Sequence, residues 1–81
     1  MFIAGNWKMN GTLDEARALA RTLVDQLPEG APTTALFPPA PHLTAGRDEV
    51  SDSPLFVGGQ DCSPHPNGAH TGDVAAAMLV D

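Results

Sequence analysis

The sequence predicts an α/β fold in which short parallel strands alternate with covering helices. Three short apolar segments are predicted to be buried strands: residues 2–5, 33–37 and 55–58. Each of these segments is followed by a segment with helical character: residues 13–27, 43–50 and 73–80. Strands and helices that alternate in this order form a parallel sheet through right-handed crossovers.

The segment after the first strand carries the clearest helix signal in the chain. Thr12 and Glu15 have the spacing of a capping box, in which each side chain bonds the other residue's backbone N–H. Pro28 and Gly30 mark the end of the helix. Apolar residues spaced three and four apart define the face that packs on the sheet: Ala16, Leu19, Ala20, Leu23, Val24 and Leu27.

The second half of the chain is predicted with weaker signals. A Pro-Pro pair stops the second strand, and residues 43–50 are expected to form a short helix that Gly46 weakens. Residues 60–72 are expected to form a long polar loop. The third helix is expected over residues 73–80, with Asp73 in its first turn.

Composition excludes several classes of function. The chain has 81 residues and a net charge of −6, so it lacks the basic surface that nucleic acids or anionic membranes require. Its single cysteine, Cys62, cannot form an internal disulfide. No apolar stretch approaches the roughly 20 residues of a membrane-spanning helix, and the first residues do not resemble a signal peptide. We therefore expect a cytoplasmic protein that binds neither nucleic acid nor membrane.

Functional groups of parallel α/β folds lie on the loops that follow the strands. The first of these loops contains Lys8, the only lysine, with no acidic residue within five positions. Such a cation can hold an anionic ligand such as a phosphate or an enediolate, although a solvated surface lysine is the simpler alternative. Asn6 can serve as a ligand or as a turn residue that bonds its own backbone. Trp7 is expected to be a packing residue.

Three segments resemble triosephosphate isomerases. The strongest is Gly-Asn-Trp-Lys-Met-Asn-Gly at residues 5–11, directly after the first strand. Val-Gly-Gly-Gln-Asp at residues 57–61 and Gly-Ala-His-Thr-Gly-Asp at residues 68–73 follow in the matching order. The resemblance covers essentially the whole chain. It implies that residues 1–81 are the N-terminal portion of a (β/α)₈ barrel, namely its first three βα units, because a complete barrel needs about 250 residues.

The resemblance also implies an activity. The family interconverts dihydroxyacetone phosphate and D-glyceraldehyde 3-phosphate by proton transfer through an enediolate, in glycolysis and gluconeogenesis. Lys8 matches the family's catalytic and substrate-binding lysine, and Asn6 matches its substrate-binding amide. No cofactor and no metal are expected. The family's electrophilic histidine and glutamate base would lie beyond Asp81, so we expect the 81-residue chain alone to be inactive, and none of its three histidines is assigned to that role.

The resemblance further implies a homodimer that forms through the third loop. Thr71 matches the residue at the tip of the loop, which inserts into the neighbouring subunit. Gln60 and Asp61 match residues close to the same contact. His70 stands where a larger aromatic ring is usual, and Asp61 stands where asparagine is common, so both are expected interface variants.

Two other functions stay open. A non-catalytic barrel fragment could bury its open strand edges by self-association. An unrelated flavodoxin-like domain would need a glycine-rich first loop, which this sequence lacks.

Cys62 with His65 and His70 superficially suggests a metal site, but their spacing is irregular. We expect Cys62 to be a half-buried packing residue.

Overall fold

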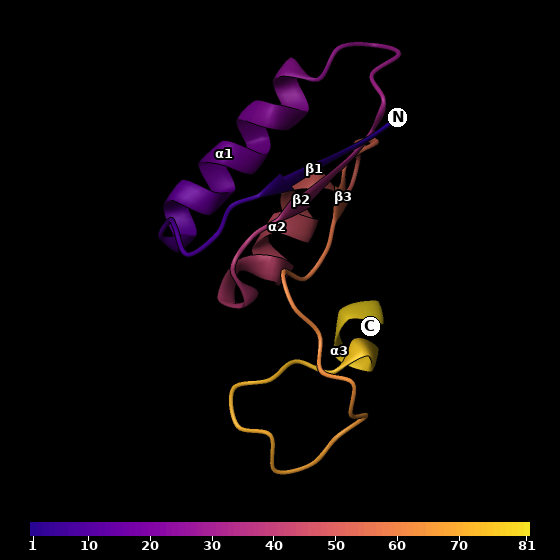
Figure 1. The fold of residues 1–81 in the computed structure, drawn as a ribbon. Helices are drawn as coiled ribbons and strands as arrows, with labels where there is room; N and C mark the ends of the chain where they lie inside the picture. The colour runs from indigo at the N-terminus through magenta and orange to yellow at the C-terminus, as the bar shows by residue number, and fades with distance from the viewer.

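The computed structural model describes residues 1–81 and confirms the predicted α/β class (Figure 1). The sheet is three-stranded and parallel, in the order β1-β2-β3, and it is open rather than closed into a barrel. The elements in chain order are β1 (Phe2–Asn6), α1 (Leu13–Gln26), β2 (Thr33–Phe37), the 3₁₀ helix η1 (Ala40–His42), α2 (Leu43–Val50), β3 (Phe56–Val57) and α3 (Ala76–Val80).

The capping box at the start of α1 forms as predicted. The Glu15 N–H donates to Thr12 Oγ1 over 3.3 Å, and the Thr12 N–H donates to Glu15 Oε2 over 2.9 Å. Ala16 and Ala20 are buried, so the helix lies against the sheet through its small residues. The short loop before α1 is thereby fixed at both ends, by β1 and by the cap.

The core lies between the sheet and the helices α1 and α2. Ala20 of α1, Leu36 of β2, Val50 of α2 and Leu55 before β3 form a buried cluster. Trp7 packs against this cluster, which confirms its predicted packing role. The two helices are also joined at the surface by a bidentate ion pair, in which the Arg21 guanidinium approaches the Glu49 carboxylate to 3.0 Å.

The rest of the sheet is open to solvent. Both edge strands keep large apolar side chains exposed, with 59% of Phe2, 45% of Ile3 and 60% of Phe56 accessible. Phe2 and Ile3 point to opposite faces of β1, so neither face of this edge strand is fully covered. No helix of the chain is long and apolar enough to cross a membrane.

The bounds of β1 and α1 each differ from the prediction by one residue at the C-terminal end, and those of β3 and α3 differ more. β3 contains only Phe56 and Val57, because only these residues pair with β2. The third helix begins at Ala76 instead of Asp73, and no acidic residue lies in its first turn. The physical reason is a strand-like contact at the base of the loop: the Ser63 N–H donates to the Val74 carbonyl over 2.8 Å, which keeps that backbone extended.

Candidate functional site

The candidate site lies where the three parallel strands end. The loops after β1, β2 and β3 leave the sheet at the same edge, below the sheet as drawn in Figure 1. Asn6 is the last residue of β1, Lys8 lies in the loop that follows it, and Gln60 lies in the segment after β3. This edge therefore brings together three of the residues that the sequence singled out.

The backbone of the first loop turns sharply at Lys8. Lys8 has a φ of +58° and is the only non-glycine residue with a positive φ. Such a conformation costs about 1–3 kcal/mol in a residue other than glycine, so the surroundings must hold it. The Lys8 N–H donates to Asn6 Oδ1 over 2.9 Å, which is the turn-stabilising use of asparagine that the sequence left open.

Two further contacts hold the end of the first loop, near Asn10 and Gly11. Asn10 Nδ2 donates to the Trp7 carbonyl over 2.9 Å. The His42 ring, at the end of η1, lies with Nε2 3.0 Å from the Gly11 carbonyl oxygen. His42 Nδ1 is buried and has no hydrogen-bond partner. No sequence pattern predicts this contact between His42 and Gly11, because 31 positions separate the two residues.

Gln60 connects all three strand ends. Its Nε2 group donates to the Lys8 carbonyl over 2.9 Å and to the Phe37 carbonyl over 2.7 Å. The Phe37 carbonyl also accepts the Trp7 N–H over 3.1 Å. The side chain of Gln60 therefore braces the loop that carries the lysine, a contact that sequence reasoning missed when it placed Gln60 only near an interface.

Lys8 is exposed and carries the only side-chain positive charge without a carboxylate partner. Three arginines each lie within 4.0 Å of a carboxylate on the helices: Arg17, Arg21 and Arg47. Because Lys8 forms no such pair, its ammonium group is free to attract an external anion. Asn6 and Lys8 are both exposed, and neither lines a surface pocket of the chain.

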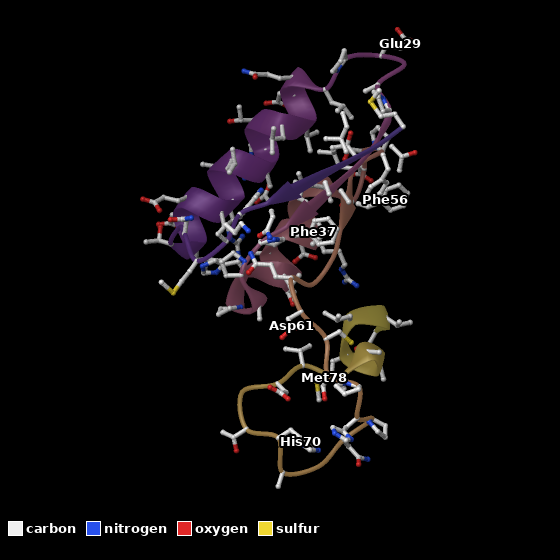
Figure 2. The ribbon with its side chains drawn as sticks, viewed as in Figure 1. Glu29, Phe37, Phe56, Asp61, His70 and Met78 are labelled. Carbon is white, nitrogen blue, oxygen red and sulfur yellow. The ribbon has the colours of Figure 1, made fainter.

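The third loop extends away from the sheet and its helices (Figure 2). Thr71, Asp61 and His70 are all exposed on it, and the structure does not bring them near Lys8 by any contact. The rings of His65 and His70 stack with their centroids 4.3 Å apart and their planes inclined by 5°. The Asp73 N–H donates to the His70 carbonyl over 3.0 Å, so the loop has internal order.

Cys62 differs from its prediction. It is exposed instead of half-buried, because it lies in the segment after β3, outside the buried cluster between the sheet and the helices. No group of three or more His, Cys, Asp or Glu side chains is arranged to hold a metal ion.

Comparison with known proteins decides the family. The family model described as triosephosphate isomerase matches residues 1–81, which is the whole chain. The chain belongs to the triosephosphate isomerase family. The triosephosphate isomerase of Caulobacter vibrioides is 51% identical over 82 residues, a match that covers 98% of this chain and 32% of the relative. That of Hahella chejuensis is 42% identical over 79 residues, with the same coverage.

A solved structure gives the same answer for the fold. The crystal structure of triosephosphate isomerase from Bartonella henselae superposes with a TM-score of 0.86 at 35% identity, and the match covers 98% of this chain and 32% of that one. The chain thus spans about a third of the length of the triosephosphate isomerases that it matches. Its open sheet corresponds to the first βα units of a triosephosphate isomerase barrel, which confirms the predicted fold class.

Proposed function

We propose that this chain supplies the substrate-binding loop of an enzyme that interconverts dihydroxyacetone phosphate and D-glyceraldehyde 3-phosphate. The observation that carries the proposal is Lys8, an unpaired cation held in a constrained turn at the carboxyl ends of the strands. This edge of a parallel α/β fold is where active sites form. Membership in the triosephosphate isomerase family supplies the substrate class.

The two site residues have distinct proposed roles. The Lys8 ammonium attracts the anionic triose phosphate and stabilises the negative charge that grows as the enediolate forms. Asn6 uses its Oδ1 atom to accept the Lys8 N–H, and its Nδ2 group makes no hydrogen bond within the chain. That amide group is available to donate to a substrate oxygen. Asn6 thus fixes the lysine with the oxygen of its side-chain amide and contacts the substrate with the nitrogen of the same amide.

The proton-transfer groups are proposed to come from later βα units. Triosephosphate isomerases use a glutamate base with a neutral histidine as electrophile. Asp14 and Glu15 of this chain lie in the first turn of α1, where Glu15 is used by the capping box, and His42 is used by the first loop. Residues 1–81 alone are therefore proposed to lack isomerase activity.

The proposed partner is a second copy of the full-length protein. The third loop carries exposed Thr71, Asp61 and His70 and extends beyond the sheet, a shape suited to insertion into a neighbouring subunit (Figure 2). The outer side of Gln60 is also exposed and can take part in the same contact. We further propose that the enzyme acts in the cytoplasm, in glycolysis and gluconeogenesis, without a cofactor.

A second candidate function is non-catalytic self-association of the fragment. The exposed apolar residues Phe2, Ile3 and Phe56 on the edge strands favour it, because unpaired strand edges promote pairing between chains. This candidate predicts that residues 1–81 form a defined oligomer. It also predicts no isomerase activity when these residues are joined to the rest of a barrel, whereas the enzyme would then be active.

The test is a hybrid protein, in which residues 1–81 are followed by the remaining residues of the Caulobacter vibrioides isomerase. We expect the hybrid protein to interconvert the two triose phosphates, and we expect purified residues 1–81 to show no activity in the same assay. A folded but inactive hybrid would show that the first loop of this chain cannot serve the reaction. Activity of residues 1–81 alone would contradict the proposed location of the proton-transfer groups.

A further inference from the structure

Gln60 makes two hydrogen bonds to residues that follow or end the other two strands of the sheet. It follows β3, yet its Nε2 group donates to the carbonyl oxygens of Lys8 after β1 and of Phe37 at the end of β2, over 2.9 Å and 2.7 Å. These partners lie 52 and 23 positions earlier in the sequence. One side chain therefore ties the loop after β1 to the ends of the two other strands.

The chemistry of the two contacts is specific to an amide. Both partners are backbone carbonyls, which only accept hydrogen bonds, so a group with two donor hydrogens must face them. The NH₂ of glutamine supplies one hydrogen to each carbonyl. The opposite orientation would place Oε1 against two carbonyl oxygens that cannot donate to it, and the Phe37 carbonyl would keep only the Trp7 N–H. A carboxylate or a thioether of the same length cannot make either bond.

Gln60 binds the backbone of Lys8, which has an unfavourable conformation. Lys8 has a φ of +58°, a conformation that persists in a residue other than glycine only where its surroundings fix it. Its N–H is bound by Asn6 Oδ1 and its carbonyl is bound by Gln60 Nε2. Both polar groups of the Lys8 backbone are thus bound by side chains, the N–H by Asn6 at the end of β1 and the carbonyl by Gln60 after β3.

We propose that Gln60 is a positioning residue for Lys8, which sets the direction of the lysine side chain through the backbone of the first loop. This role rests on the proposed isomerase function. It differs from the interface role expected for Gln60, because it acts within one chain. The anion that Lys8 meets is a triose phosphate, so loss of the brace weakens substrate binding as well as turnover.

The experiment measures kcat and KM of the hybrid protein with Gln60→Met and with Gln60→Glu. Both changes remove the donor hydrogens at nearly constant length. We expect kcat/KM to fall by about tenfold to a hundredfold, which is the effect of misplacing a catalytic group by about 1 Å. We also expect KM to rise and inhibition by inorganic phosphate to weaken, because the lysine no longer points at the anion. Gln26→Met, at the exposed end of α1, is the matched control and should leave both constants unchanged.

The readouts separate this role from other effects of the same change. Partial unfolding lowers the number of active sites and therefore kcat, but it leaves KM unchanged, so an unchanged KM would overturn the proposal. A loss that disappears when the protein concentration is raised would indicate an interface role instead, and would also overturn it. An inactive unsubstituted hybrid would refute the proposed function, whereas an active hybrid that tolerates both changes would refute only the role of Gln60.

Discussion

The residues of the first loop show how local strain and long-range contacts are combined in this chain. Lys8 adopts a left-handed backbone conformation, and Asn6 and Gln60 bind its two backbone polar groups. The resemblance to the family pointed to Asn6 and Lys8 from sequence because both lie in one short motif. The contact of Gln60 could not be predicted in this way, because it joins residues 52 positions apart.

The close approach of Gly58 to Phe37 leads to a prediction at the residue scale. A Cβ atom added at Gly58 would lie 2.7 Å from Phe37 Cε1, which is too close for two non-bonded carbon atoms. We expect Gly58→Ala to lower the free energy of unfolding of the hybrid protein by about 1–3 kcal/mol, as other overpacked sites do. Urea denaturation measures the change, and an unchanged midpoint would show that the Phe37 ring moves aside freely.

At the scale of the element, sequence patterns located most helices and strands. The bounds predicted for residues 33–37 and 43–50 agree with β2 and α2, and a proline pair marks the end of β2 locally. The predicted start of α3 was wrong by three residues, because the contact between Ser63 and Val74 holds the backbone before Ala76 extended. That contact depends on the course of the third loop, which no local pattern encodes.

Helix α2 supplies the second prediction, with the opposite sign to that for Gly58. Gly46 lies inside α2, and a Cβ atom there would meet its nearest neighbours, Pro38 and Val57, at ordinary distances of 3.6 Å and more. We expect Gly46→Ala to raise the free energy of unfolding by up to about 1 kcal/mol, because alanine favours the helix. The two glycine variants are controls for each other in the same urea titration. Destabilisation by Gly46→Ala would mean that α2 packs more tightly than its distances indicate.

At the scale of the whole molecule, residues 1–81 form a sheet with two open edges and a core of few buried residues. Only 10 of the 81 residues are buried, and a domain of this size has a small margin of stability. The match to about a third of each relative accounts for this, because the barrel encloses its core only when its sheet closes. The open sheet explains why Phe2 on the edge strand β1 is exposed.

The third prediction concerns the isolated chain. We expect purified residues 1–81 to self-associate with rising concentration, because Phe2, Ile3 and Phe56 are exposed beside unpaired strand edges. Sedimentation equilibrium over a range of concentrations measures the mass, and the hybrid protein is the control in which these strands are covered. A monomer at every concentration, with sharp and dispersed amide signals in a two-dimensional NMR spectrum, would contradict this expectation.

The most direct test of the central claim is the kinetics of the hybrid protein with Lys8→Gln, which removes the positive charge and keeps a polar side chain. Arg47→Gln, which removes the positive charge of another exposed residue, on α2, is the matched control. The account predicts that Lys8→Gln lowers kcat/KM at least about a hundredfold, the usual effect of losing a group that stabilises developing negative charge. It predicts no change for Arg47→Gln. Equal and small effects of both variants would contradict the assignment of Lys8 to the substrate-binding site.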